Sequence, residues 1–495
     1  MNVTSSDTAP ARMDLVIACV CALAVALVAI STQSLWIDEG GTAYKALQPT
    51  LGGWWSALRW EHNSNMQLPL YLLYSWAWTK IFGISEFALR AANIPPFLIC
   101  IAGLKYIFSR SRRLFLWSVL FLLTSPFVWF YLNEARPYIL LLASSTLVVG
   151  SICRVVLDAD IAERPPARWF QILAYSALAM TATSALAALW TAVSLLAAWH
   201  CIGRKFPRVF FQSAPIAFVL LLIGHLFLVT YYLWAMRIGS QIPHFGNRPL
   251  FALFHIAYEM MGFAGFGPGR LILRGAGVET LRPFALPLAM LLGCWLSLFA
   301  LAHRELSAAL RDRLRVVTFG ILLVAPLIAF AIGLIQHVRI SPRYLTPVFP
   351  MFLCLATLAA DIAWRRALKG RAIITLLLCL SITSALELRF ALRHTKEDYR
   401  SAASLAKEAV RQHIKICWAA DVQTAIYYRV IEESERDTGS NDVVLYQNPS
   451  RDPDCEIVIL SREDVYDSSG NLRRFVRDRG FKPSEIFQGF QVYRR

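Results

Sequence analysis

The sequence predicts a polytopic α-helical membrane protein with about eleven transmembrane helices and a small C-terminal α/β domain. Of its 495 residues, 57% are hydrophobic and only 17% are charged, and the mean hydropathy is +0.49. Apolar runs of about 17 to 25 residues, the length that crosses the hydrocarbon core of a bilayer, recur up to residue 391 and then stop. This composition excludes a water-soluble protein.

The apolar runs define the membrane part, residues 1–391. The predicted spans are 13–32, 87–109, 114–131, 138–157, 169–183, 186–202, 209–235, 285–303, 315–335, 345–361 and 372–391. One further apolar stretch, residues 66–82, is shorter and ends among Trp and Tyr side chains that favour the membrane interface. It is therefore predicted to be a juxtamembrane helix.

The basic residues set the orientation. With the N-terminus in the cytoplasm, the inner loops carry 18 Lys and Arg on about 55 residues, and the outer loops carry 11 on about 115. Eleven spans then place residues 392–495 outside. The tail and the outer loops contain no usable Asn-x-Ser/Thr glycosylation site, which favours a bacterial inner membrane with the tail in the periplasm.

The net charge of +16 belongs to the membrane part, because residues 392–495 hold 17 basic and 17 acidic residues. Because these basic loops lie beside membrane-spanning helices, membrane lipids are their expected partners. The tail has no basic stripe interleaved with exposed aromatic residues, so nucleic acid is not expected as a partner.

The tail alternates between helix-like and strand-like segments. Helices are predicted near 399–412, 422–430 and 471–479, and strands at HIKICWAA (413–420), VVLYQ (443–447), EIVIL (456–460) and FQVYR (490–494). Cys417 and Cys455 either form a disulfide in an oxidising compartment or remain buried thiols in two strands. The tail sequence contains no Gly-rich phosphate loop, metal-ligand cluster or nucleophile motif.

The first outer loop, residues 33–86, carries the strongest candidate for chemistry. In SLWIDEGGTAY (34–44), the adjacent acids Asp38 and Glu39 follow the first span, and two glycines permit a tight turn close to a ligand. The alternative is an acid pair that stabilises a helix N-terminus. Six of the fifteen tryptophans lie between residues 36 and 78, where they suit an interfacial belt or platforms for stacking sugars.

Two other outer loops hold candidate substrate-binding residues. The second, NEARPY (133–138), carries Glu134 and Arg136, which form either a binding pair or a capping pair. The fifth, QHVRISPRYLTP (336–347), brings Arg339, Arg343 and Tyr344 to the same side of the membrane. Arginine in an outer loop runs against the positive-inside bias and suits the binding of a phosphate.

The long outer loop, residues 237–284, is predicted to contain a surface helix near 250–263. Its GFGPGR run (265–270) is either a mobile lid or a plain turn, since it neither follows a strand nor opens a βαβ unit. His225, the clearest ionisable residue within a span, is either a packing histidine with satisfied hydrogen bonds or a functional one.

Carboxylates, arginines and indoles at one membrane face suit the transfer of a sugar from a lipid-linked phosphate. The phosphate departs as an anion without being protonated, so this reaction needs a general base but no general acid. Glycoside hydrolysis differs because a second carboxyl must act as the acid. A single displacement inverts the anomeric centre.

Five segments together resemble the bacterial GT-C class glycosyltransferases. They are SLWIDEGGTAY, QLPLYLLY (67–74), NEARPYILLL (133–142), SPRYLTPVFP (341–350) and KEDYRSAA (396–403). The resemblance is to the branch of protein O-mannosyltransferase-like, lipid A aminoarabinose transferase-like and rhizobial core-transferase-like enzymes. It covers the membrane part and implies a polyprenyl-phosphate monosaccharide donor, with a cell-envelope glycan, lipid or protein as acceptor.

The resemblance also implies roles for single residues. Asp38 is the catalytic base with Glu39 beside it, Glu134 positions substrates or a metal, and Arg343 holds the carrier phosphate. The remaining substrate-binding candidates are Arg136, His62, Tyr71, Arg339 and Tyr344. A divalent metal is left open, with Asp38, Glu39, Glu134 and His62 as the oxygen and nitrogen ligands that could hold it.

Two departures from the family leave the donor sugar open. The juxtamembrane helix has Leu68-Pro69 where relatives often have two prolines, and residues 183–186 replace a His-Tyr pair that many relatives carry. The alternatives to a transferase are a transporter or flippase, or a polymerase, of lipid-linked saccharides. A transporter predicts inverted repeats, broken helices and mid-membrane charges, whereas the acid pair after the first span favours the enzyme.

The charge distribution generates a prediction about topology. A reporter fused after Arg495 should be active only in the external compartment, because eleven spans carry the chain across the membrane an odd number of times. Reporter activity in the cytoplasm would contradict the count and restore residues 66–82 as a span.

Overall fold

The computed structural model describes residues 8–60, 64–158, 165–238, 249–270, 272–273, 277–310, 312–335, 341–366, 368–446 and 454–495. The chain forms two compact units. Unit 1 comprises residues 1–30, 61–71 and 91–394, and unit 2 comprises residues 31–60, 72–90 and 395–495. The sequence assigned the first outer loop to the membrane module, whereas in the structure most of this loop clusters with the C-terminal domain.

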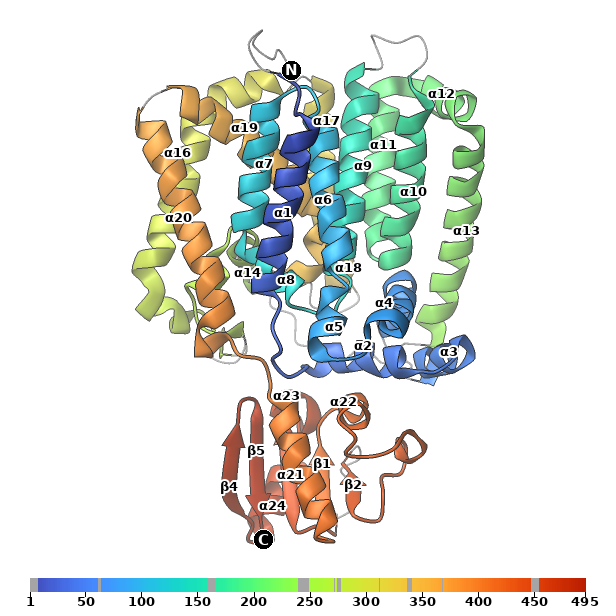
Figure 1. Cartoon of the computed structure of the whole chain (residues 1–495), viewed down its shortest axis with the longest axis vertical. Coiled ribbons are helices and arrows are strands. Elements are labelled where there is room, and N and C mark those ends of the chain that lie inside the picture. The colour runs from blue at the N-terminus through green and yellow to red at the C-terminus, as the bar shows by residue number, and fades with distance from the viewer. Residues whose placement is uncertain are drawn as a thin grey trace. The chain divides into compact units, whose positions relative to one another are not determined.

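Unit 1 is a bundle of long helices (Figure 1). Its principal helices are α1 (Arg12–Ala29), α6 (Ile94–Ile107), α7 (Arg112–Thr124), α8 (Pro126–Leu132), α9 (Tyr138–Asp158), α10 (Ala167–Thr183), α11 (Ala187–Ile202), α12 (Phe206–Ser213), α13 (Pro215–Ile238), α14 (Pro249–Met260), α16 (Ala285–Ala309), α17 (Asp312–Phe319), α18 (Ala325–Ile335), α19 (Phe349–Arg366) and α20 (Leu368–Phe390). Helix α9 packs against α6 and α10, and α19 packs against α7, α16 and α20.

Among the described residues, eight helices are long and apolar enough to cross a membrane, and nine if a bent pair counts as one span. The spans predicted at 169–183 and 186–202 correspond to α10 and α11. These two helices are slightly shorter, with 17 and 16 residues, and are not among the eight. Each of the eleven predicted spans therefore has a helix or a helix pair in the structure, and the protein is a multi-pass membrane protein.

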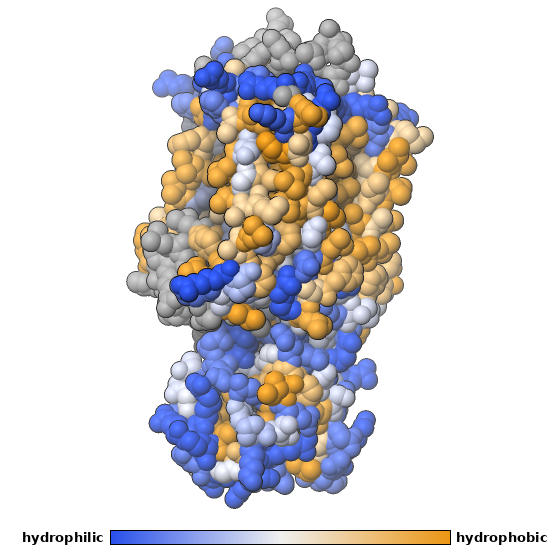
Figure 2. Space-filling view, turned by 90° about the vertical axis from the view of Figure 1, so that its left-hand side faces the viewer, coloured by the Kyte–Doolittle hydropathy of each residue, from blue (hydrophilic) through white to orange (hydrophobic). Residues whose placement is uncertain are grey.

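The sides of the bundle are apolar. Figure 2 shows hydrophobic side chains covering the flank of unit 1, with hydrophilic side chains gathered at its upper end. On α13 the exposed residues include Ile216, Val219, Leu220, Leu222, Ile223, Leu226 and Phe227. Exposed aliphatic side chains at this density are what a lipid-facing helix requires.

Two acids within the bundle are paired with arginines. Asp14 of α1 accepts hydrogen bonds from Arg112 at 2.9 Å, and Asp361 of α19 pairs with Arg113 at 2.5 Å, so both acids tie their helices to the start of α7. His225 contacts Thr181 through Nε2 at 3.1 Å and the carbonyl of Leu221 through Nδ1 at 2.8 Å. Both ring nitrogens are thus engaged, as expected for a packing histidine.

The span predicted at 114–131 is broken. Helices α7 and α8 meet at an angle of 60° at Ser125, because Pro126 has no backbone N–H and disfavours helical geometry in the residue before it. The indole of Trp129 donates to the carbonyl of Leu123 at 2.7 Å and so satisfies one carbonyl that the break exposes. The bend also directs the end of α8 and the following Glu134 away from the axis of α7.

Unit 2 contains the predicted α/β domain. Its sheet has the order β2 (Val443–Leu445), β1 (Ile416–Ala419), β3 (Ile457–Ser461), β5 (Phe490–Arg494) and β4 (Lys482–Phe487). The first three strands are parallel, and β5 and β4 are antiparallel to their neighbours. The helices of the domain are α21 (Tyr399–Arg411), α22 (Val422–Tyr427), α23 (Glu463–Tyr466) and α24 (Asn471–Asp478).

Alternate residues of the buried strands serve two cores. Ile416, Trp418 and Ile459 face α21 and α22, whereas Val458 and Leu460 face α24. The Cys417 sulfur, on the α24 side, is bonded to Cys455 with a Cα–Cα distance of 5.7 Å, so the structure resolves the sequence alternatives in favour of the disulfide. Strand β4 was not predicted, because an edge strand that carries a proline and polar residues lacks a buried pattern.

The described residues of the first outer loop form three α-helices, and a fourth begins at its end. They are α2 (Ile37–Leu47), α3 (Leu51–Trp60), α4 (Pro69–Phe82) and α5 (Glu86–Ala91). Helix α4 matches the predicted stretch 66–82, and its 14 residues are too few for a membrane span. Within unit 2, α2 packs against α22.

Candidate functional site

The two acids of the first outer loop lie in the first turn of α2. Glu39 is fully buried and accepts a hydrogen bond from the backbone N–H of Trp36 at 3.4 Å. The next residue, Gly40, lies directly against α22, where an added Cβ would stand 1.8 Å from the Thr424 hydroxyl oxygen. A glycine is therefore required here for close packing and not for a ligand, which corrects the sequence interpretation.

Both carboxylate oxygens of Glu39 are engaged by cations. Arg90 donates from Nε to Oε1 at 2.8 Å and from Nη2 to Oε2 at 2.7 Å, and both side chains are fully buried. Lys396 donates to the same Oε2 at 3.0 Å. A carboxylate held by two cations is a poor proton acceptor, because its charged form is strongly favoured.

Arg90 also fixes the chain that leads into α2. Its guanidinium donates to the carbonyls of Ser31 at 2.9 Å, Gln33 at 2.7 Å and Ser34 at 3.1 Å. Its planar set of donors is thereby filled without any contact to water. The N-terminal end of α2 is consequently held in one place.

Asp38 differs from Glu39 although it occupies the same helical turn. It is partly exposed rather than buried. A carboxylate in the first turn of a helix is stabilised by the helix dipole. Of the two acids, Asp38 is the more exposed.

In unit 1, the break before α8 brings Glu134 into a second buried cluster. The side-chain amide of Asn93 donates to the carbonyls of Tyr131 at 3.2 Å, Leu132 at 3.2 Å and Glu134 at 2.6 Å, so one side chain holds the whole turn after α8. Glu134 is 2% exposed, and its Oε1 lies 3.7 Å from an Arg270 nitrogen.

Arg270 is the centre of this cluster. Its Nη2 lies 2.5 Å from Glu259, and its guanidinium stacks 3.4 Å from the centre of the Phe130 ring. Glu259 also accepts from the Tyr131 hydroxyl at 3.2 Å and lies 3.1 Å from His255. A guanidinium between two acids and over an aromatic face is held in one orientation.

Sequence reasoning missed Arg270, Glu259 and His255. The segment near 250–263 was predicted to be a surface helix, but α14 buries His255, Tyr258 and Glu259. The sequence did contain a pattern that could have revealed this pair: His255 and Glu259 are four residues apart, which places both on one face of a helix. In the GFGPGR run, an added Cβ at Gly265 would stand 1.8 Å from the carbonyl oxygen of Ser384, which favours a tightly packed turn over a lid.

The other predicted binding residues have separate surroundings. Arg136 donates to the Asn65 side chain at 3.0 Å, and Tyr71 is fully buried. Arg343 lies in the short helix η6 (Pro342–Val348), with its guanidinium 5.3 Å from the centre of the Tyr344 ring. His62 and Arg339 lie outside the described residues.

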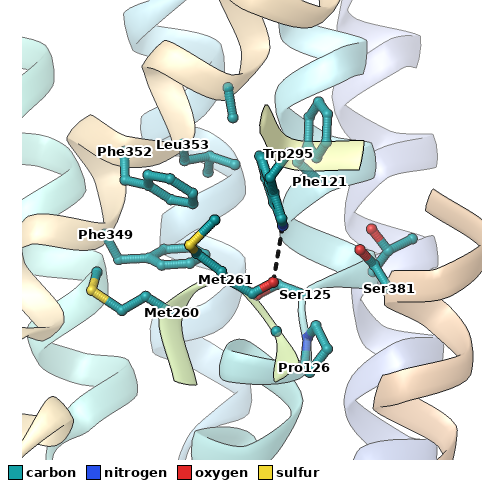
Figure 3. A pocket seen from close by; sticks show the side chains of 13 residues that line it. Phe121, Ser125, Pro126, Met260, Met261, Trp295, Phe349, Phe352, Leu353 and Ser381 are labelled. Atoms are coloured by element: carbon teal, nitrogen blue, oxygen red, sulfur yellow. Dashed lines mark hydrogen bonds between the residues drawn. The ribbon is translucent and has the colours of Figure 1, made fainter. Parts of the chain in front are cut away.

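A small cavity lies within unit 1, with both apolar and polar side chains in its lining. Its lining comes from the α7–α8 break, from Met260 at the end of α14 and Met261 after it, and from α16, α19 and α20 (Figure 3). The indole of Trp295 donates to the carbonyl of Met261 at 3.0 Å. Phe349, Phe352 and Leu353 form one wall, and Ser125 and Ser381 also line the cavity.

The proposed metal ligands do not form a ligand set in the part of the chain that the structure describes. Within it, no group of three or more His, Cys, Asp and Glu side chains could hold a metal ion. The oxygens of Glu39 are engaged by Arg90 and Lys396, and Arg270 lies beside Glu134. No step of the chemistry below is therefore assigned to a metal.

The helical bundle, the first-loop helices and the C-terminal sheet together define a polytopic membrane protein of the GT-C fold class. The structure of ArnT from Cupriavidus metallidurans in the apo state is similar over 97% of both chains, with a TM-score of 0.58 and 14% identity. The structure of ArnT bound to undecaprenyl phosphate is similar over 98% of both chains, with a TM-score of 0.54 and 14% identity.

Searches by sequence give no match. No protein-family model matches the chain, and no curated protein matches it significantly. The likeness to ArnT therefore establishes the fold, and it confirms the fold class that the sequence predicts.

The burial of Glu39 generates a prediction about stability. Replacing Arg90 with Ala, or Glu39 with Gln, should destabilise the protein by about 3–5 kcal/mol, because either change leaves a charge buried without its partner. Thermal unfolding of the purified chain measures this loss.

Asp38→Asn serves as the control and should change stability by less than about 1 kcal/mol, because Asp38 is partly exposed. A Glu39→Gln variant with normal stability but no activity would contradict the structural role of Glu39 and return it to the chemistry.

Proposed function

We propose that the protein is an inverting glycosyltransferase that moves a monosaccharide from a polyprenyl-phosphate donor to a hydroxyl on a lipid, polysaccharide or protein. The reaction would take place at the outer face of the bacterial cytoplasmic membrane. The observation that carries the proposal is the contrast between the two first-loop acids. Glu39 is buried between two cations, whereas Asp38, in the same turn of the helix, is partly exposed.

The chemistry assigned to Asp38 is that of a general base. Its carboxylate takes the proton of the acceptor hydroxyl as the hydroxyl oxygen attacks the anomeric carbon of the donor. The bond between that carbon and the phosphate oxygen breaks, and its electron pair leaves with the polyprenyl phosphate. Because one bond forms as the other breaks on the opposite side, the product is inverted at the anomeric carbon.

Arg343 is the proposed ligand of the carrier phosphate. A guanidinium can bind two phosphate oxygens at once, and the nearby Tyr344 ring restricts its orientation. Support for a lipid carrier comes from ArnT, whose similar fold has been solved with undecaprenyl phosphate bound.

Glu134, Arg136 and Tyr71 remain proposed substrate-positioning residues, with Arg270 and Glu259 added from the structure. Arg270 balances Glu134 and Glu259, so the cluster presents polar groups without a large net charge. Such a cluster suits the hydroxyls of a sugar better than a strongly charged ligand.

The broken span α7–α8 is a feature that a transporter also predicts. Here, however, the carbonyl of Leu123 at the break already accepts a hydrogen bond from the indole N–H of Trp129. Transporters use such carbonyls to bind ions, so this contact favours the enzyme.

The base assignment is tested by Asp38→Asn. This variant keeps the shape of the side chain and loses the proton acceptor, so turnover should fall about 10²-fold or more while folding is unchanged. Release of undecaprenyl phosphate from a panel of undecaprenyl-phosphate monosaccharides is the measurement. Near-normal turnover by the variant would move the base to another acid, with Glu134 the first candidate.

The phosphate assignment is tested by Arg343→Ala. Charge-assisted hydrogen bonds contribute about 1.5–3 kcal/mol, so kcat/KM for the lipid donor should fall roughly 10- to 150-fold. Arg343→Lys should recover only part of this, because lysine cannot bind two oxygens in a fixed geometry. The loss should persist at saturating acceptor and appear in donor binding alone. Survival of both binding and turnover would make Arg343 an interface anchor and shift the role to Arg339 or Arg136.

A further inference from the structure

The loop that precedes Arg270 in unit 1 is rich in glycine. Residues 262–269 (GFAGFGPG) contain four glycines, and Gly262 has a backbone φ of +86°, which favours glycine. Because glycine gives a chain its greatest conformational freedom, this sequence does little to fix the residue that follows it. That residue is Arg270, the centre of the polar cluster with Glu134 and Glu259. Contacts from elsewhere in the bundle must therefore hold the loop in place.

The segment after α20 supplies such contacts. It forms the short helix η7 (Leu392–His394). The guanidinium of Arg393 donates from Nε to the carbonyl of Gly267 at 3.0 Å and from Nη2 to the carbonyl of Gly265 at 2.8 Å. The His394 ring donates through Nε2 to the same Gly265 carbonyl at 2.9 Å. Two neighbouring side chains thus engage the backbone of the loop at two of its glycines.

Close packing restrains the loop at both of its ends. Ser384 of α20 donates to the carbonyl of Gly262 at 2.6 Å. An added Cβ at Gly269 would clash with the carbonyl oxygen of Arg393, so the two backbones lie directly against each other. Since Gly269 immediately precedes Arg270, this contact carries the restraint from Arg393 to the backbone beside the Arg270 side chain.

The side chain of Arg393 is itself held in place. Its Nη2 donates to the Glu387 carboxylate of α20 at 2.8 Å, and its guanidinium lies 5.5 Å from the centre of the Phe284 ring. The planar guanidinium can donate in several fixed directions at once, which lets it link a carboxylate on its own helix to two carbonyls of the loop. Arg393 therefore couples the position of the loop to the end of α20.

We propose that Arg393 is a positioning residue for Arg270, and that it acts by holding the carbonyls of Gly265 and Gly267. With the loop held, the Arg270 guanidinium stays between Glu134 and Glu259. The inference rests on the proposed function, in which Arg270 positions the substrate. A displacement of about 1 Å in a group that positions a substrate can lower the rate about 10²-fold, so support from outside the site matters for turnover.

The first experiment is a double-mutant cycle in kcat/KM with the purified full-length chain and a panel of undecaprenyl-phosphate monosaccharides. Arg393→Ala should lower kcat/KM roughly 10-fold or more, and Arg270→Ala at least as much. In the Arg270→Ala background, the added Arg393→Ala change should cost less than about 2-fold, because the residue through which it acts is gone. Arg393→Lys should recover part of the loss, since lysine cannot donate to both carbonyls in a fixed geometry.

Arg366→Ala is the matched control. Arg366, at the end of α19, also donates to a carboxylate and a backbone carbonyl, namely Glu305 at 2.8 Å and Leu301 at 2.6 Å. Its side chain is 39% exposed, close to the 31% of Arg393. Arg366→Ala should leave kcat/KM unchanged in both the wild-type and the Arg270→Ala backgrounds.

The second experiment needs no activity. Hydrogen exchange is measured by mass spectrometry in peptides that contain Phe266, whose backbone N–H donates to the carbonyl of Phe263 at 3.2 Å. Arg393→Ala should accelerate this exchange roughly 10-fold, because a loop without its external contacts opens more often. Arg393→Lys should be intermediate and Arg366→Ala unchanged. Unchanged exchange in peptides from α9 shows that each variant is folded.

The outcomes separate this inference from the proposed function. A loss in Arg393→Ala that persisted undiminished in the Arg270→Ala background, or unchanged exchange at Phe266, would overturn the role of Arg393. If Arg393→Ala did not fold, Arg393→Lys and Ser384→Ala would carry the same cycle, because each removes fewer contacts with the loop.

Normal turnover by Arg270→Ala would also overturn the inference, but it would leave the assignment of the base untouched. A wild-type chain that turned over none of the donors would instead contradict the proposed function. The exchange measurement would then still decide whether Arg393 holds the loop.

Discussion

The buried ion pair between Arg90 and Glu39 is the interaction on which the rest of unit 2 depends. Two charges removed from water are tolerated only when every donor and acceptor is paired. Arg90 meets this requirement with both oxygens of Glu39 and with the carbonyls of Ser31, Gln33 and Ser34. Because these partners lie in the chain entering α2, one guanidinium fixes the position of that chain and of the first turn of the helix that carries Asp38.

The same interaction explains why neighbouring acids serve different purposes. In the first turn of α2, successive side chains point in directions about 100° apart, so Glu39 is turned into the protein and Asp38 is not. Lys396 then adds the C-terminal domain to this arrangement through Glu39, and Gly40 allows α22 to approach closely. The C-terminal domain therefore helps to hold in place the helix that carries the proposed base.

Unit 1 also contains buried polar groups that need hydrogen-bond partners, and it supplies these partners from different residues. A break in a membrane helix exposes backbone groups that lipid cannot satisfy, and Asn93 and Trp129 satisfy several of them around α8. The resulting turn carries Glu134 to Arg270, where the guanidinium, two acids and an aromatic ring compensate one another. In this cluster of the bundle, each described charged group has a partner.

The sequence by itself determined the helical membrane architecture and the alternation of helices and strands in the C-terminal domain, and it supplied Asp38, Glu39, Glu134 and Arg343 as candidate site residues. These features follow from local signals: the length of apolar runs, strand periodicity and short motifs. Only the tertiary structure decided that Glu39 is buried, that Cys417 pairs with Cys455, and that Arg270 and Glu259 belong to one polar cluster. Arg90 pairs with an acid 51 residues away and Lys396 with one 357 residues away, and such pairings depend on chain packing that no local pattern records.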